Sequence, residues 1–257
     1  MDRAAFFDVD KTLIPGSSLF LLARGMYERD FLRVRDIIKF GWGQLMFVVS
    51  GTERSTGMEM SRESTLSFVK GRYQDELRSW GREIADDRIL PRVYQDVVKI
   101  IETHVASGVK TYLVTAAPIE LAFYLADALG MDGALGTESE IDAEGRYTGR
   151  LLGDVLHGPA KAKAVADLAA QSNIDLSESF AYSDSTNDLP LLESVGNPHA
   201  VNPDHELRRI AMSRGWPVHE LRTRRKALLI GIPSALAGAA LLGIGLAVGV
   251  AIGRRRS

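Results

Sequence analysis

Short apolar runs that end in polar residues recur along the chain and predict buried strands. Ala4–Phe7 is the first such run, and residues 109–115 and Phe180–Ser183 form two more. Between them lie segments in which apolar residues recur every three to four positions, a spacing typical of helices that pack on a sheet. One of these is the amphipathic segment 92–107, which Gly108 ends. The alternation predicts an α/β fold with a doubly wound, Rossmann-like parallel sheet.

Two carboxylates stand one residue apart directly after the first predicted strand. Asp8 and Asp10 belong to the sequence DVDKT, at a strand end of the kind where open α/β sheets bind ligands. Carboxylates this close repel each other unless a cation lies between them, and Mg²⁺ is a natural, oxygen-liking partner. One carboxylate can then attack an electrophile while the other moves a proton. The alternative is a chance match in a polar turn.

Polar groups also follow the other predicted strands and open a predicted helix. Thr115 ends the second strand, so its hydroxyl and the backbone N–H groups that follow offer an anion site. Lys161 falls in the first turn of a helix, where it opposes the helix dipole, so we expect another anion to hold it. Asp184 and Asp188 follow the third strand. In this order the groups predict a site for phosphate and metal.

The four segments resemble the four motifs of the haloacid-dehalogenase-type phosphatases, within the phosphoserine-phosphatase-like branch, subfamily IB. DVDKT resembles the first motif, Thr115 the second, Lys161 the third and the pair Asp184 and Asp188 the fourth. The stretch 183–203, SDSTNDLPLLESVGNPHAVNP, is especially similar to that branch. The resemblance covers residues 2–218.

The resemblance implies a role for each acidic residue. Asp8 is the nucleophile that forms an aspartyl-phosphate, and Asp10 protonates the leaving alcohol and then deprotonates the attacking water. The predicted metal residues are Asp8, Asp10, Asp184 and Asp188, with Mg²⁺ as the cofactor. Within this set Asp10 contributes through its backbone region, and Asp188 supports the water shell of the metal.

The remaining implied roles concern the phosphoryl group. Thr115, Ala116 and Lys161 bind its oxygens, and Asn187 positions either phosphate or a metal-bound water. A positively charged site of this kind suits phosphoryl transfer, which needs positioning and charge neutralisation above all. We expect two nearby hydroxyl residues to stabilise their loops and not to react. They are Thr12 and Ser185.

Two segments interrupt the predicted core, which comprises residues 1–16 and 91–218. Residues 17–90 do not have the pattern of a sheet, and they predict helices over 18–29, 31–50, 56–70 and 74–86. In the family such an insertion is a cap that closes over the active site and selects the substrate. The apolar stripe in 31–50 indicates cap packing, with a membrane-facing surface as the alternative. The second insertion, 137–153, predicts a hairpin with its turn near Glu144 and Gly145.

Composition excludes several classes of function. The formal net charge is −2, which indicates no nucleic-acid-binding surface, and the chain contains no cysteine, which excludes disulfides and thiolate catalysis.

The histidines lack metal-ligand spacing. His199 and Asp204 spell the H-x-x-x-x-D pair of glycerolipid acyltransferases, but we expect a short strand and a turn there. His157 is close to Lys161 and either contacts the leaving group or is solvated.

The end of the chain predicts a membrane anchor. Residues 227–253 form a run of 27 residues without a charge, and a basic linker, 219–226, precedes it. About 20 apolar residues in a helix span a bilayer, so the run predicts a transmembrane helix. Residues 1–3 lead straight into the first strand, so we expect no signal peptide and a cytoplasmic catalytic domain on a single-pass cell-membrane protein. Gly245, Gly249 and Gly253 offer a weak homodimer contact.

These observations predict a membrane-anchored, Mg²⁺-dependent phosphomonoester hydrolase with a small or lipid phosphomonoester as substrate. A phosphotransferase to an alcohol acceptor and a catalytically silent, membrane-tethered scaffold are the alternatives. Phosphoserine phosphatase is a third, but the family's substrate-contacting glutamate, nine residues after the nucleophile, is replaced by Ser17.

Overall fold

The computed structural model describes residues 1–29, 31 and 69–221. The chain divides into two compact units, Met1–His219 and Glu220–Ser257. The predicted helix 31–50, most of the predicted helix 56–70 and the apolar run 227–253 lie outside the described residues. Within the described ranges, no helix is both long enough and apolar enough to cross a membrane.

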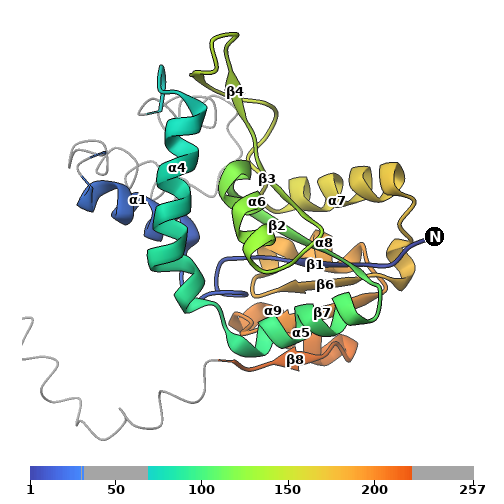
Figure 1. The fold of residues 1–257 in the computed structure, drawn as a ribbon. Coiled ribbons are helices and arrows are strands. Elements are labelled where there is room, and N and C mark those ends of the chain that lie inside the picture. Colours follow the sequence, from blue (N-terminus) through green and yellow to red (C-terminus); the bar gives the residue numbers. More distant parts are fainter. Residues whose placement is uncertain (30, 32–68, 222–257) are drawn as a thin grey trace, which may run out of the picture. The chain divides into compact units, whose positions relative to one another are not determined.

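A parallel sheet forms the centre of the first unit (Figure 1). Within the described residues it has six strands, in the order β3 (Gly133–Thr137), β2 (Lys110–Pro118), β1 (Ala4–Phe7), β6 (Phe180–Ser183), β7 (Asn197–Val201) and β8 (Val218–His219). The chain therefore runs outward from β1 in one direction and then outward from β6 in the other. This is the predicted doubly wound topology, and its switch point lies between β1 and β6.

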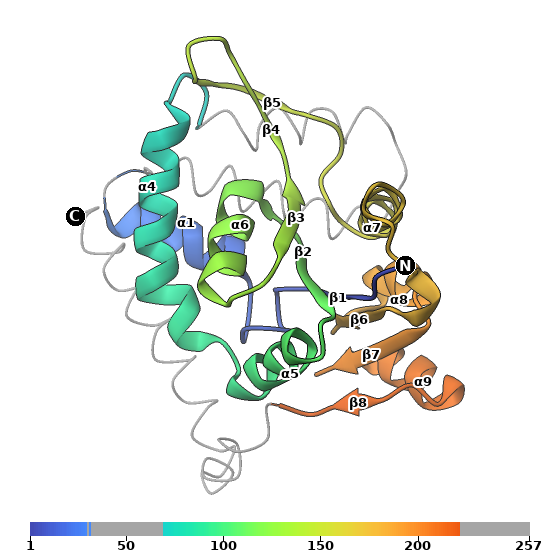
Figure 2. The same cartoon turned by 45° about the vertical axis from the view of Figure 1, so that its right-hand side comes forward.

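Helices cover both faces of the sheet, so its strands are apolar on both sides. Phe6 belongs to a core cluster with side chains of three helices, α7 (Pro159–Ser172), α8 (Leu189–Glu193) and α9 (His205–Arg214). Its neighbour Phe7 points to the opposite face, where it contacts His104 of α5 (Gln95–Ala106). The helix α6 (Ile119–Ala128) packs on β2 and β3. Figure 2 shows α5 and α6 on the side of the sheet away from α7, α8 and α9.

The helix predicted over 92–107 begins later, at Gln95. A π-helical turn, Ala85–Ile89, and a 3₁₀ turn, Leu90–Arg92, come before it. The 3₁₀ turn contains Pro91, which has no N–H to donate, and Val93 then adopts an extended conformation with ψ of 130°. The helix can only start anew after this extended residue.

Two helices of the predicted cap fall within the described residues. They are α1 (Ser18–Glu28) and α4 (Gln74–Ile84), close to the predicted ranges 18–29 and 74–86. Gly25 of α1 faces Ile84, where a Cβ atom would come within 2.6 Å of the isoleucine side chain. The absence of a side chain at Gly25 therefore allows the two helices to approach closely.

The second insertion forms the predicted hairpin, with strands β4 (Ser139–Ile141) and β5 (Tyr147–Leu151). Gly145 adopts φ of +80° in the turn, as predicted for this position. The hairpin also contacts the chain that leads into α4. The backbone N–H of Gly71 donates to the carbonyl of Tyr147 over 2.8 Å, and that of Gln74 donates to Gly145 over 2.9 Å. The two insertions are thus joined to each other.

Candidate active site

The loop after β1 carries the first two acidic residues to the carboxyl edge of the sheet, beside the switch point. The backbone N–H of Asp8 still donates to Tyr182 of β6, over 3.0 Å. The chain then turns sharply, because Lys11 adopts a left-handed conformation with φ of 60°. Asp10 Oδ1 accepts a 2.7 Å hydrogen bond from the backbone N–H of Ser18, in the first turn of α1. The cap therefore contacts Asp10 directly.

Lys161 joins two carboxylates that come from different strand ends. Its Nζ lies 2.5 Å from Asp8 Oδ1 and 2.7 Å from Asp188 Oδ2. Ser183 also donates its hydroxyl hydrogen to Asp188 Oδ2, over 2.8 Å. All three charged residues are at most 5% exposed. The anion expected to hold Lys161 is this pair of aspartates, and we call Asp8, Lys161 and Asp188 the charged triad.

Burial and charge set the protonation states of the charged triad. Burial raises the pKa of Asp8 to about 7, against the opposing attraction of Lys161. Burial acts to lower the pKa of Lys161, but the ion pairs with Asp8 and Asp188 outweigh it and raise this pKa above its usual value. Lys161 therefore stays protonated, and one lysine does not fully offset the burial of Asp8. Positive charge placed at this edge would favour the ionised form of this carboxylate.

The acidic residues at this edge supply oxygen donors suited to Mg²⁺. Asp188 Oδ1 is buried and has no hydrogen-bond partner among the described residues. Asp184 is only 6% exposed, and Lys11 Nζ lies 3.8 Å from its Oδ2. In the described part of the chain, however, no three acidic or histidine side chains are placed to hold an ion in this conformation. The donor set therefore fits Mg²⁺ in chemistry and charge, while its side chains contact Lys161 and Ser18.

The predicted phosphate-binding residues lie on three elements: Thr115 and Ala116 in β2, Lys161 in α7 and Asn187 in the 3₁₀ turn Thr186–Asp188. Thr115 is buried in the last part of β2, and its Oγ1 accepts the backbone N–H of Ala117 over 3.2 Å, which leaves the hydroxyl hydrogen to be donated. The carbonyl of Ala116 accepts from Thr137 Oγ1 over 2.8 Å. The side chain of Asn187 is exposed, next to the buried Asp188. The structure thus brings Asp8, Lys161 and Asp188 into contact but leaves Asn187 at the rim.

Two hydroxyl residues were expected to stabilise their loops. Ser185 does so, because its Oγ accepts the backbone N–H of Asn187 over 3.2 Å. Thr12 differs, since its buried Oγ1 has no hydrogen-bond partner among the described residues. His157, for which contact with the leaving group was one of two expectations, precedes α7 and is exposed to solvent.

Histidines that are scattered in the sequence meet on one face of the sheet. The rings of Phe7, Tyr182, His199 and His219 stack in succession across β1, β6, β7 and β8, with centroid separations of 4.5, 4.5 and 5.2 Å. His199 Nδ1 lies 2.9 Å from His219 Nε2, and His104 Nε2 lies 2.8 Å from the Tyr182 hydroxyl. We call these five residues the histidine ladder. Sequence reasoning missed it because only the pairing of the parallel strands reveals it.

The histidine ladder also accounts for the H-x-x-x-x-D pair. His199 lies on β7, as expected for a short strand, and its ring contacts His219. Asp204 caps α9, accepting the backbone N–H of Leu207 over 2.7 Å. Both residues therefore have structural partners, and neither arrangement supports an acyltransferase site.

Comparison with known proteins agrees with this geometry. The sequence profile of the haloacid dehalogenase-like hydrolases matches residues 5–193. The chain belongs to this family. A phosphoserine phosphatase, SerB1, from Mycobacterium tuberculosis is 43% identical, over 92% of this chain and 77% of its own length. The similarity places the chain in the phosphoserine-phosphatase-like branch, as a hydrolase of the phosphatase type.

Solved structures of other proteins share the fold of this haloacid dehalogenase-like hydrolase. A protein of unknown function from Bordetella pertussis Tohama I has a TM-score of 0.75 and 32% identity, and the match covers 86% of this chain and 99% of that one. A substrate-bound phosphoserine phosphatase has a TM-score of 0.58 at 18% identity, with coverage of 90% and 98%. At that identity the second likeness concerns the fold alone.

Proposed function

We propose that the protein hydrolyses phosphate monoesters through a phosphoryl group carried on Asp8, with Mg²⁺ as cofactor. The observation that carries this proposal is the charged triad, in which Lys161 Nζ lies 2.5 Å from Asp8 Oδ1 at the switch point of the sheet. A buried carboxylate beside a buried lysine provides a nucleophile and a positive charge for phosphoryl oxygens in one place.

The proposed steps use the roles that the resemblance to the family implies for these side chains. A carboxylate oxygen of Asp8 attacks phosphorus, the bond from phosphorus to the leaving alcohol breaks, and Asp10 gives its proton to the alcohol oxygen. Asp10 then takes a proton from water as the water oxygen attacks phosphorus, which releases Asp8 and inorganic phosphate. Lys161 offsets the charge on the phosphoryl oxygens, and the Thr115 hydroxyl donates a hydrogen bond to one of them.

The residues that would hold Mg²⁺ are Asp8, Asp184 and the backbone at Asp10, with Asp188 towards the water shell. The ion supplies positive charge next to the phosphoryl oxygens. The buried Oδ1 of Asp188 has no hydrogen-bond partner among the described residues. This free acceptor supports the presence of a water molecule of the metal's shell at this edge. The pKa of Asp8, raised to about 7 by burial, supports a need for that charge.

Phosphoserine is the second candidate substrate, because a relative with 43% identity is named a phosphoserine phosphatase. The residue nine positions after the nucleophile weighs against it. Ser17 caps α1, and its Oγ accepts the backbone N–H of Phe20 over 3.4 Å. A serine in this role offers no negative charge for the substrate amine, unlike the glutamate of the family.

Purified full-length protein tests the reaction. With Mg²⁺ we expect phosphate release from a panel of phosphomonoesters, loss of release with EDTA, and a phosphoprotein that hydroxylamine cleaves. Added acceptor alcohols distinguish the phosphotransferase alternative, since they would yield new phosphate esters in place of free phosphate. No release from any ester on the panel would contradict the proposal and favour the silent scaffold.

We also propose that residues 227–253 anchor the protein in the cell membrane, with the catalytic domain in the cytoplasm. The support for the anchor is the run of 27 uncharged residues, and the basic residues on both of its flanks do not fix its orientation. Full-length protein should stay with membranes through a carbonate wash, and release by that wash would contradict the anchor. A chain cut after Leu221 keeps β8 and should leave the membrane fraction with its phosphatase activity intact.

A further inference from the structure

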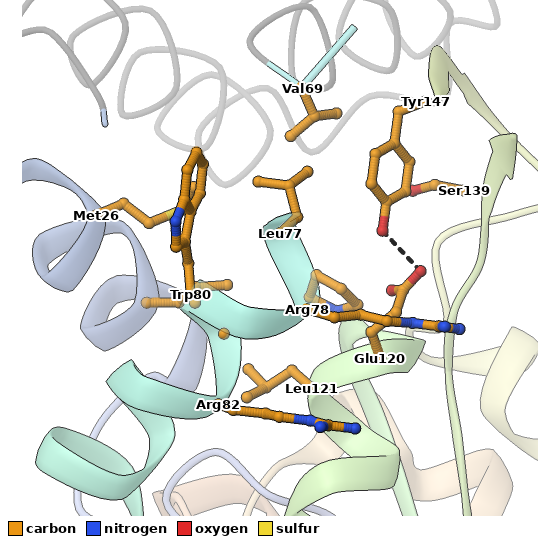
Figure 3. Close-up of a pocket in the computed structure, with 13 residues that line it drawn as sticks. Met26, Val69, Leu77, Arg78, Trp80, Arg82, Glu120, Leu121, Ser139 and Tyr147 are labelled. Atoms are coloured by element: carbon orange, nitrogen blue, oxygen red, sulfur yellow. Dashed lines mark hydrogen bonds between the residues drawn. The ribbon is translucent and has the colours of Figure 1, made fainter. Parts of the chain in front are cut away.

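A hollow lies between the two cap helices, α6 and the β4–β5 hairpin (Figure 3). The hollow is partly open to solvent. Most of its walls are aliphatic and aromatic, and they include Leu22, Met26, Val69, Leu77, Trp80 and Leu121. Arg78, Arg82, Glu120 and Ser139 also line it. None of these residues takes part in the reaction proposed above.

The hollow begins close to the catalytic groups along two elements. Leu22 lies on α1 one turn after Ser18, whose backbone N–H holds Asp10, so it is about 6 Å further along the helix. Pro118, another lining residue, ends β2 three residues after Thr115, at most about 10 Å further along the strand. Asp10 and Thr115 do not line the hollow, but two of its lining residues lie within about 6 to 10 Å along α1 and β2 of the positions that contact or carry these catalytic groups.

Two of the polar side chains that line the hollow, Glu120 and Tyr147, are paired with each other. Glu120 Oε1 accepts the Tyr147 hydroxyl over 2.8 Å and Gln74 Nε2 over 3.1 Å, as the dashed contact in Figure 3 shows in part. The guanidinium of Arg82 lies over the Tyr124 ring, 5.6 Å from its centroid. A leaving group whose ammonium bound Glu120 would have to displace the contacts of this carboxylate, whereas an apolar group would not.

We propose that this hollow binds the apolar part of the leaving alcohol, so that the preferred substrates are phosphate monoesters with an aliphatic chain. The inference rests on the proposed phosphatase function and adds the class of substrate to it. Each methylene buried is worth about 0.8 kcal/mol, so kcat/KM should rise up to about fourfold per methylene until the hollow is filled. Burial of the methylenes favours substrates with a longer alkyl chain and leaves the chemistry at Asp8 unchanged.

Monoalkyl phosphates of two, four, six and eight carbons test the proposal on full-length protein with Mg²⁺. We expect kcat/KM to rise at least tenfold from ethyl to octyl phosphate. A flat series, with ethyl phosphate hydrolysed normally, would overturn the inference and leave the phosphatase proposal intact. Failure to hydrolyse any ester would overturn the phosphatase proposal instead.

A variant that fills the hollow sharpens the test. Gly81 lines the hollow on α4, and a Cβ added there meets no heavy atom of the described residues within 4 Å. In Gly81→Leu the ratio of kcat/KM for octyl over ethyl phosphate should fall at least fivefold, while Gly81→Ala should keep most of that ratio. An equal ratio of kcat/KM for the two esters in Gly81→Leu and wild type would mean that the alkyl chain of the substrate binds elsewhere.

Binding without turnover provides a readout that does not depend on hydrolysis. We expect octylphosphonate to bind wild-type protein at least tenfold more tightly than ethylphosphonate in calorimetry, and Gly81→Leu to reduce this difference. Equal Kd values for the two phosphonates would overturn the inference whatever the esters show. Phe123→Ala serves as a control outside the hollow, since Phe123 is an exposed apolar residue of α6.

Discussion

The molecule contains two buried polar clusters that solve the same problem differently. In the charged triad, one ammonium and two carboxyl groups meet at the carboxyl edge of the sheet, and the buried Oδ1 of Asp188 has no partner among the described residues. In the histidine ladder, neutral rings stack across four strands and bond to each other in pairs. Burial lowers the pKa of His199 to about 4, with contributions from His219 and His104, so these rings are uncharged at neutral pH.

The comparison separates a group kept for function from one kept for the fold. A buried polar atom without a partner costs free energy, so a native structure retains it where a ligand or a reaction needs it. A neutral network whose members satisfy each other carries no such cost. On this basis substitutions in the charged triad should abolish activity, whereas substitutions in the histidine ladder should change only stability.

The largest expected effect is on catalysis by Asp8→Asn. The amide keeps the shape of the side chain but cannot attack phosphorus, so kcat should fall on the order of 10⁴-fold or more. The melting temperature should stay near that of wild type, because the substitution removes one of several negative charges at this edge. Phosphate release and thermal unfolding measure the two quantities, and turnover near the wild-type value would refute the assignment of the nucleophile.

Lys161→Met should have the largest effect on stability. Removing the lysine leaves the buried carboxylates of Asp8 and Asp188 without their counter-charge, which costs about 3–5 kcal/mol. Lys163→Met is a matched control on the same helix, because Lys163 is 77% exposed and pairs with Asp167 over 2.6 Å. That exposed pair should be worth less than about 1 kcal/mol. Urea unfolding compares the two variants, and similar losses would contradict the importance of the charged triad for folding.

The histidine ladder should make stability depend on pH. Because the pKa of His199 falls from its usual 6.5 to about 4 on folding, the unfolded chain binds more protons between these values. The contribution is present above pH 6.5 and is lost as the pH falls towards 4, by about 2–3 kcal/mol. Urea unfolding at pH 7.5 and 4.5 should show a smaller difference in His199→Phe than in wild type. An unchanged difference would mean that other groups control the acid sensitivity.

The smallest expected effect comes from Tyr182→Phe, also in the histidine ladder. The substitution removes the 2.8 Å hydrogen bond to His104 Nε2 and keeps the stacked ring. The free energy of unfolding should fall by about 1 kcal/mol, and kcat should stay within twofold of wild type. A large loss of activity would show that the histidine ladder acts on the active site through Phe7, which neighbours Asp8.

Local pattern predicted the parts of the site that depend on strand ends and helix starts. Asp8 follows β1 directly, Thr115 lies near the end of β2, which continues to Pro118, and the unfavourable place of Lys161 in its helix correctly indicated a nearby anion. The pattern did not give the rotamer of Asp10, whose contact is with Ser18. That contact depends on how α1 packs, and therefore on the tertiary structure.

Features that depend on contacts between distant parts of the chain could not be predicted from the sequence pattern. His199 and His219 meet only because β7 and β8 lie side by side, and His104 joins them from a helix in another part of the chain. The late start of α5 follows from Pro91 and the extended Val93, which interrupted an otherwise helical spacing of apolar residues. The roles of the site residues and the anchor over 227–253 stay predictions.

The contacts between the two insertions limit how the cap can move. The chain entering α4 is tied to the hairpin by backbone hydrogen bonds from Gly71 to Tyr147 and from Gln74 to Gly145. A swing of α4 away from the core must therefore carry the hairpin with it or break these bonds. We therefore expect α4 and the hairpin to move together, so that shortening the hairpin would change the motion of a helix more than fifty residues earlier in the sequence.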